Sequence, residues 1–176
     1  MSLEEWWNLL KDSGWLDEVS EDEAERIKAE AEQYADDPSW AFNALAASGG
    51  DAECIENDGD YTKWVVEAYE EASGRVFAPK NVKDAVDWDR GVATVSFEVG
   101  GKVFQTEFAQ EDDYVAVEVH EFMNEVMAAL GEPKRFYILP TDDQTYGLVC
   151  VTPETYARAC SLGLIPNQED WPPAED

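Results

Sequence analysis

The sequence predicts an α+β protein: a mainly antiparallel sheet of about five strands with helices packed on it, and a helical N-terminal segment over residues 1–50. Apolar residues recur at helical spacing through the first third of the chain and alternate with polar residues from Val86 onward. They make up 44 % of the 176 residues, which is enough for a packed core. We expect one domain over residues 1–166, followed by a mobile acidic tail at 167–176.

Capping residues place the first helices. Ser2 and Glu5 are spaced as a capping box, and Ser20 and Glu23 repeat that spacing. Asp37-Pro38 is typical of a cap followed by a first-turn proline. The sequence therefore predicts three successive helices in the N-terminal segment.

The third helix is expected to be short and to end at Gly49-Gly50. Residues 51–60 follow as an acidic loop, and Asp60 is expected to cap a fourth helix that stops at Gly74.

Two turn signals predict a three-stranded antiparallel meander over residues 86–108. Gly100-Gly101 is typical of a two-residue hairpin turn, since both positions need positive φ. A second two-residue turn is expected at Arg90-Gly91. The turn at Gly100-Gly101 places Phe97 opposite Phe104 on the neighbouring strand. The turn at Arg90-Gly91 places Trp88 opposite Ala93. Both turns place the apolar side chains on one face, which supports the meander.

The remaining elements are a helix over about 113–130, a hairpin and a last helix. The two continuous apolar runs, 136–139 and 147–151, are expected to form a hairpin covered on both faces. Thr152-Pro153-Glu154 starts the last helix.

One stretch, EVHEFMNEV at 118–126, differs by one residue from the His-Glu-x-x-His pattern of zinc proteases. Asn124 occupies the place of the second histidine, and His120 is the only histidine in the chain. The sequence also has no phosphate-binding glycine loop and no dinucleotide fingerprint. We therefore predict no metal, no cofactor and no catalytic residues, and a protein that is not an enzyme.

The formal net charge is −28, from 40 acidic and 12 basic residues. Residues 1–60 hold 18 acidic and 3 basic residues, and residues 61–176 hold 22 and 9. A surface this negative repels nucleic acid and anionic lipid and attracts a basic partner. No signal peptide or membrane span is predicted, and the three cysteines have no paired spacing, so we expect a cytoplasmic protein.

Residues 137–166, YILPTDDQTYGLVCVTPETYARACSLGLIP, resemble the C-terminal part of small acidic immunity proteins from bacterial toxin systems. In those proteins a hairpin with an Asp-x-Gln turn leads into a Thr-Pro-Glu helix. The resemblance covers about 30 of 176 residues and implies a basic toxin as partner; it carries no functional residues onto this chain.

The charge and the resemblance predict an acidic inhibitor that captures a basic protein, such as a nuclease toxin, by electrostatic complementarity. An aromatic anchor at Trp7 would slow dissociation. The predicted partner-binding residues are Trp7, Asp51, Glu53, Glu56, Asp58, Glu118, Glu121 and Glu125. The alternative is a halophile-type acidic protein with an enzymatic or small-ligand pocket between sheet and helices. The sequence does not indicate an oligomeric state.

Overall fold

The computed structural model describes residues 1–141 and 143–166, and the tail expected to be mobile, 167–176, lies outside them. The helices are α1 (Leu3–Ser13), α2 (Glu21–Ala31), α3 (Glu67–Ala72), α4 (Val117–Leu130) and α5 (Pro153–Ser161). The strands are β1 (Ser48–Asp51), β2 (Lys80–Asp87), β3 (Val92–Val99), β4 (Lys102–Ala109), β5 (Arg135–Leu139) and β6 (Thr145–Val151). Short 3₁₀ segments lie at Trp15–Asp17, Glu32–Tyr34 and Pro38–Leu45, and a π-helical segment, Tyr61–Val66, leads into α3.

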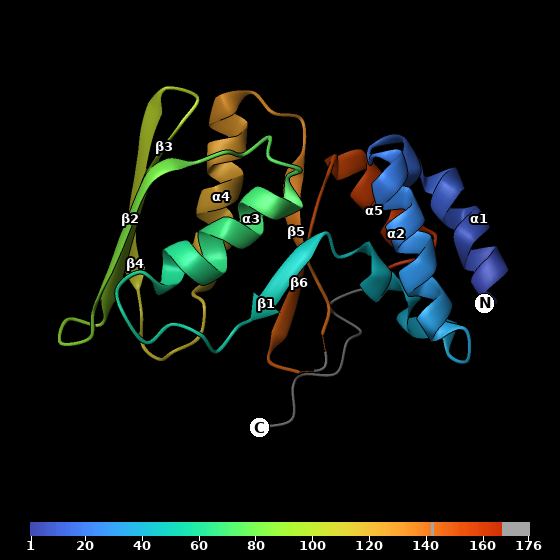
Figure 1. Ribbon diagram of the computed structural model, residues 1–176, viewed down its shortest axis with the longest axis horizontal. Coiled ribbons are helices and arrows are strands. Elements are labelled where there is room, and N and C mark those ends of the chain that lie inside the picture. Colours follow the sequence, from blue (N-terminus) through green and yellow to red (C-terminus); the bar gives the residue numbers. More distant parts are fainter. Residues whose placement is uncertain (142, 167–176) are drawn as a thin grey trace.

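The fold is α+β, and its elements form layers along the long axis. Figure 1 shows α1, α2 and α5 at one end, then the sheet with β1, β5 and β6, then α3 and α4, and the sheet with β2, β3 and β4 at the other end. The expectation of a single sheet of about five strands is wrong, because the described residues form two three-stranded antiparallel sheets, ordered β1-β6-β5 and β2-β3-β4.

The strand that the sequence did not predict is β1, which contains Gly49-Gly50 where a helix end was expected. Gly49 lies opposite Gly147, and a Cβ at Gly49 would collide with the carbonyl oxygen of Tyr146. These glycines therefore allow close approach of two strands instead of ending a helix.

The expected N-terminal caps are present. Ser2 accepts the Glu5 amide at 3.2 Å, and Glu5 accepts the Ser2 amide at 2.7 Å. Ser20 accepts the Glu23 amide at 3.2 Å, but Glu23 turns its carboxylate to Arg26 instead of back to the cap.

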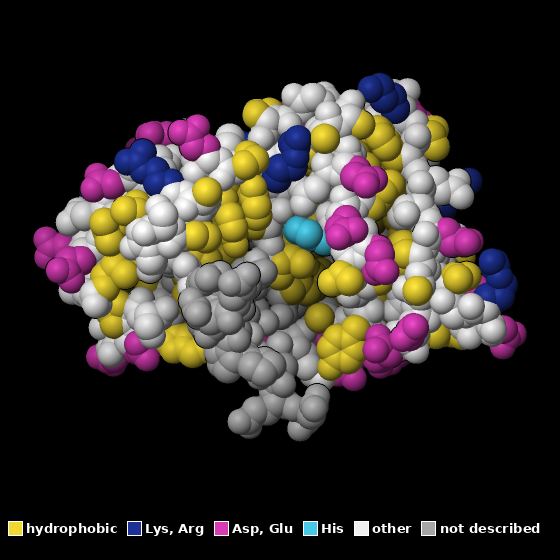
Figure 2. All heavy atoms as spheres, turned by 180° about the vertical axis from the view of Figure 1, so that it is seen from behind, with side chains coloured by type: hydrophobic (Ala, Val, Ile, Leu, Met, Phe, Trp, Pro, Cys, Tyr) yellow, Lys and Arg dark blue, Asp and Glu magenta, His cyan; other side chains and the backbone are white. Residues whose placement is uncertain are grey.

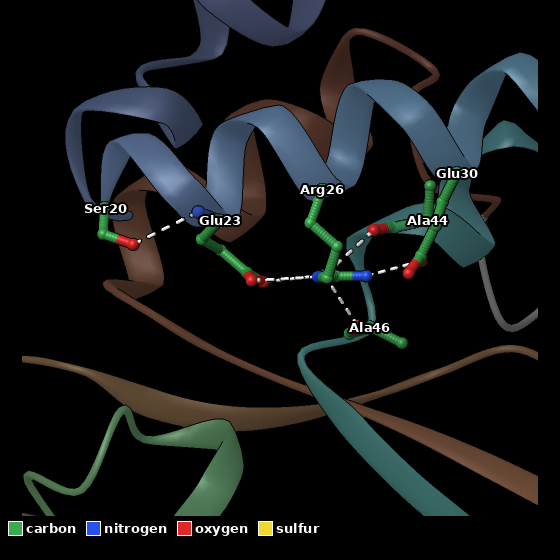
Figure 3. A network of polar contacts seen from close by, with 6 residues as sticks. All are labelled: Ser20, Glu23, Arg26, Glu30, Ala44 and Ala46. Atoms are coloured by element: carbon green, nitrogen blue, oxygen red, sulfur yellow. Dashed lines mark hydrogen bonds and ion pairs between the residues drawn. The ribbon is translucent and has the colours of Figure 1, made fainter.

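Arg26 fastens α2 to the chain that enters β1. Its guanidinium donates to Glu23 at 2.7 and 2.9 Å, to Glu30 at 2.5 Å, and to the carbonyls of Ala44 and Ala46 at 3.3 and 2.9 Å (Figure 3). A planar cation with five donors can join two carboxylates and two carbonyls in this way.

The β3–β4 hairpin has the predicted register, with Phe97 opposite Phe104. The register predicted for β2 and β3 is wrong by two residues. Ala93 lies opposite Val86 instead of Trp88, and Trp88 lies in the connecting turn. That turn holds four residues instead of two, and Asp87 Oδ1 accepts the Arg90 amide in it at 3.0 Å. Since the error is an even number of residues, the buried face is unchanged.

β6 contributes to two hydrophobic cores, as expected for a strand covered on both faces. Leu148 and Cys150 join the core between α3, α4 and the β2-β3-β4 sheet, and Val149 and Val151 join the core under α1, α2 and α5. The helix expected over about 113–130 begins at Val117, after an extended segment that runs beside the acidic loop.

Candidate protein interface

The acidic loop 51–60 lies beside the chain that leads into α4. The Ile55 amide donates to the Asp113 carbonyl at 2.9 Å, and the Val115 amide donates to the Ala52 carbonyl at 2.8 Å. This short antiparallel pairing brings acids that are about 60 residues apart in sequence to the start of α4.

We name the resulting surface the α4 patch, defined as Asp51, Glu53, Asp112, Asp113, Glu118, Glu121 and Glu125. All but the half-exposed Asp113 are exposed. No ion pair joins any of these carboxylates to a basic side chain of residues 1–141 or 143–166. In Figure 2 several acidic side chains lie beside the single histidine, which belongs to α4. The α4 patch is thus an uncompensated group of carboxylates on one surface.

Hydrogen bonds order the end of the α4 patch that comes from the loop. Asp51 Oδ1 accepts the Glu53 amide at 2.9 Å, and Glu53 accepts the side-chain amide of Gln144. The same Gln144 nitrogen lies 3.1 Å from the hydroxyl of Tyr114, whose side chain is 40 % exposed. Sequence reasoning missed Asp112, Asp113 and Tyr114, although two adjacent acids before an aromatic residue were a visible signal.

Glu56 and Asp58, which were predicted with the α4 patch residues, lie instead against β2. Asp58 Oδ1 accepts the Val86 amide at 2.8 Å, and Trp88 Nε1 donates to the Glu56 carbonyl at 3.1 Å. Asp58 therefore fastens the loop to the edge of a sheet. Its carboxylate is already engaged within the fold.

Asp60 does not cap the helix that follows it. It accepts the Glu56 and Asn57 amides at 2.9 and 2.7 Å. Burial raises the pKa of Asp60, but these hydrogen bonds outweigh it and the net pKa is lowered. The amides at the start of the helix are taken by Asp84 of β2, which accepts the Gly59 amide at 2.7 Å and the Thr62 amide at 3.3 Å.

Trp7 lies on α1, at the opposite end of the long axis from the β2-β3-β4 sheet (Figure 1). It is half-buried against the core of the N-terminal helices, and Lys11 Nζ lies 5.7 Å from its ring centroid. The predicted residues are therefore spread over three places: α1, the α4 patch and the edge of β2.

His120 is half-buried and belongs to a hydrogen-bond network between α3, α4 and β5. Asn124 Nδ2 lies 3.3 Å from His120 Nε2, and the hydroxyl of Tyr69 lies 3.0 Å from Nδ1. Because an amide nitrogen only donates, Nε2 accepts and the proton resides on Nδ1. Burial lowers the pKa of His120 despite the nearby charge of Glu121. Across the described residues, no three His, Cys, Asp or Glu side chains are grouped to hold a metal ion.

A hollow of about 480 Å³ lies between α2, β6 and α3. Charged side chains on its wall are engaged within the fold. Arg26 makes the contacts described above. Lys134 pairs with Glu18, and its Nζ donates to the Glu18 carbonyl at 2.8 Å. Glu18 in turn accepts the Thr152 amide at 2.9 Å. These contacts fasten the N-terminal helical segment to the chain next to β1, β5 and β6, so these charges serve the fold.

No helix within the described ranges has both the length and the apolar character needed to cross a membrane. A scan against protein-family models, a search of curated proteins and a search of solved structures found no match to this chain.

Proposed function

We propose that this protein is an acidic inhibitor of the immunity type, which captures a basic protein such as a nuclease toxin through the α4 patch. The observation that carries the proposal is the gathering of carboxylates from two distant chain segments on one surface without a salt-bridge partner in the described ranges. Packing like charges together is unfavourable in the free protein, and a cationic partner would relieve that repulsion.

Two features of the α4 patch and one resemblance elsewhere in the chain support this proposal. Its charges are exposed, so they would steer a basic surface from a distance and raise the association rate. Tyr114 supplies an exposed aromatic ring at the edge of the patch, and tyrosine is enriched among residues that dominate binding energy. The resemblance of residues 137–166 to immunity proteins points to the same class of partner.

The experiment is capture of a partner from the organism that carries the gene, at about 50 mM salt, where the screening length is about 14 Å. The immobilised full chain is compared with two variants that lose the same charge. One carries Glu118→Gln, Glu121→Gln and Glu125→Gln on α4. The control carries three exposed changes, two on α2 and one directly after it: Glu21→Gln, Glu25→Gln and Glu32→Gln.

The proposal expects a basic protein bound by the wild type and by the control, and lost by the α4 variant. Circular dichroism in dilute buffer must show all three chains folded. The proposal fails if the captured proteins are not basic, or if the α4 variant captures them as well as the control does.

A further inference from the structure

The edges of the two sheets differ in how they are protected. The outer edge of β5 is held by Asn124, which accepts the Phe136 amide at 2.8 Å and donates to its carbonyl at 3.0 Å. The outer edge of β2 is covered through Asp58, which accepts the Val86 amide, and β2 also carries an irregularity between Lys80 and Lys83. Such devices stop a sheet from pairing with another chain.

β4 is an edge strand without these devices. It runs for eight residues without proline or bulge and pairs with β3 in unbroken register. The two-residue turn at Gly100-Gly101 makes Val99 and Lys102 a hydrogen-bonded pair, so the main-chain groups of Val103, Gln105 and Glu107 point away from β3. Among the described residues no hydrogen bond reaches those groups. Val103 is also 76 % exposed.

α4 runs along β4 on the buried side of the sheet. Lys102 Nζ donates to the Ala129 carbonyl at 3.1 Å, so the end of α4 lies at the start of β4. Phe122 faces the same sheet, with its ring 5.5 Å from that of Phe97. Helical periodicity puts Glu118 and Glu125 on the same side of α4 as Phe122 and Ala129, which is the side near β4. Asn124 and His120 lie on another side of the helix, where they contact β5 and α3.

We propose that an extended basic segment of the partner adds to β4 as a further strand, with its lysine or arginine side chains directed toward Glu118 and Glu125. This inference rests on the proposed function and names how the partner docks. Glu118 and Glu125 are about 10.5 Å apart along the helix, and every second side chain of a strand repeats at about 6.7 Å. Basic residues at alternate positions can therefore reach both carboxylates.

Charge favours such a segment over a second copy of this chain. If two β4 strands paired, each α4 row of Glu118, Glu121 and Glu125 would be brought close to the row of the other copy, and like charges would repel. A strand with alternate basic residues would meet the same row with attraction and would satisfy the free main-chain groups.

The test uses a synthetic seven-residue peptide of alternating valine and lysine, with blocked ends, titrated into the full chain. We take the added strand to run antiparallel to β4, so that its residues that exchange hydrogen bonds with Val103, Gln105 and Glu107 have side chains on the face away from α4. In that arrangement, lysine side chains that face α4 require the valine amides to point at β4. We therefore expect N-methylation of the valines to abolish binding and N-methylation of the lysines to leave it intact. A peptide of the same composition with contiguous lysines should bind more weakly. Q105P removes one outward donor of β4, and we expect it to weaken binding about tenfold.

The N-methylated peptides test the inference even if Q105P does not fold. Suppose that all four peptides bind equally and that none binds the chain with Glu118, Glu121 and Glu125 changed to glutamine. That result would overturn strand addition and would leave the proposed function standing. Absence of peptide binding while the captured basic partner still binds would overturn it too. Dimers of the free chain that Q105P dissociates would assign β4 to a second copy instead.

Discussion

Asn124 of α4 holds Phe136 of β5 by both of its main-chain groups, with hydrogen bonds of 2.8 and 3.0 Å. Asn124 occupies the place of the second histidine in a zinc-protease pattern. Its side-chain amide bonds the outer edge of β5 in the way that a neighbouring strand would. Its remaining amide proton meets His120 Nε2. The motif at 118–126 is therefore explained by the fold.

Replacing Asn124 with alanine should lower the free energy of unfolding by about 2–3 kcal/mol, because two main-chain groups of the buried Phe136 lose their partner. Urea denaturation measures the change. Asn8→Ala is the matched control, since Asn8 is an exposed helical asparagine, and it should leave stability equal or slightly higher. Equal stability of both variants would show that the Asn124 bonds carry little weight.

The stability of the protein should depend on His120 below neutral pH. Burial lowers the pKa of His120 in the folded protein, whereas in the unfolded chain the histidine titrates at about pH 6.5. As pH falls, the unfolded chain therefore binds the proton before the folded protein does. The stability that neutral His120 provides is present above about pH 6.5 and is lost as pH falls toward the lower folded pKa. Protonation would also place an N–H against the Asn124 amide.

Unfolding of the wild type and of His120→Gln, measured from pH 7.5 to pH 5, checks this. The stability of the wild type relative to the variant should decrease toward pH 5, whereas carboxylates affect both chains alike. Parallel curves would mean that His120 titrates equally in the folded and unfolded states.

Arg26→Ala should destabilise the fold by about 2 kcal/mol, because the Ala44 and Ala46 carbonyls lose a charged donor and Glu23 and Glu30 lose their counter-ion. Arg158→Ala removes the same charge from an exposed helical position and should change stability by less than about 0.5 kcal/mol. Thermal unfolding of both variants gives the comparison, and similar losses would argue against a specific role for the Arg26 contacts.

Gly49 and Gly50 provide a third matched pair of variants. A Cβ at Gly49 would collide with the Tyr146 carbonyl, so Gly49→Ala should cost about 1–3 kcal/mol and disturb the β1–β6 pairing. A Cβ at Gly50 would lie 3.5 Å from the Tyr146 hydroxyl oxygen, an ordinary contact, so Gly50→Ala should be neutral or stabilising by up to about 1 kcal/mol. If both variants fold equally well, β1 does not need its close approach to β6.

Local chemistry in the sequence predicted much of the fold. The Ser2 capping box, the Gly100-Gly101 turn and the two-sided burial of β6 follow from neighbouring residues alone. The division into two sheets does not, because it depends on α4 occupying the edge of β5 through Asn124. The same is true of β1, whose glycines resemble a helix stop until the strand opposite is known.

The candidate interface was predicted only in part. Glu118, Glu121 and Glu125 were predicted from one exposed helix face, and they lie together on α4. Asp112 and Asp113 join them through the pairing of the loop with residues 113–115, a long-range contact that no local pattern announces. Glu56 and Asp58 lie apart from the α4 patch, against β2 and the turn after it. Their position could not be predicted, because a sequence does not reveal which edge a loop lies against.

The central claim is that the carboxylates of the α4 patch attract a basic partner. The most direct measurement is the dissociation constant of the captured partner at salt concentrations from 50 to 500 mM, for the wild type and for the chain with Glu118, Glu121 and Glu125 changed to glutamine. Over that range the screening length falls from about 14 to 4 Å, so wild-type binding should weaken steeply and the variant should show a shallower dependence. Wild-type binding that ignores salt, or equal slopes for the two chains, would contradict the claim.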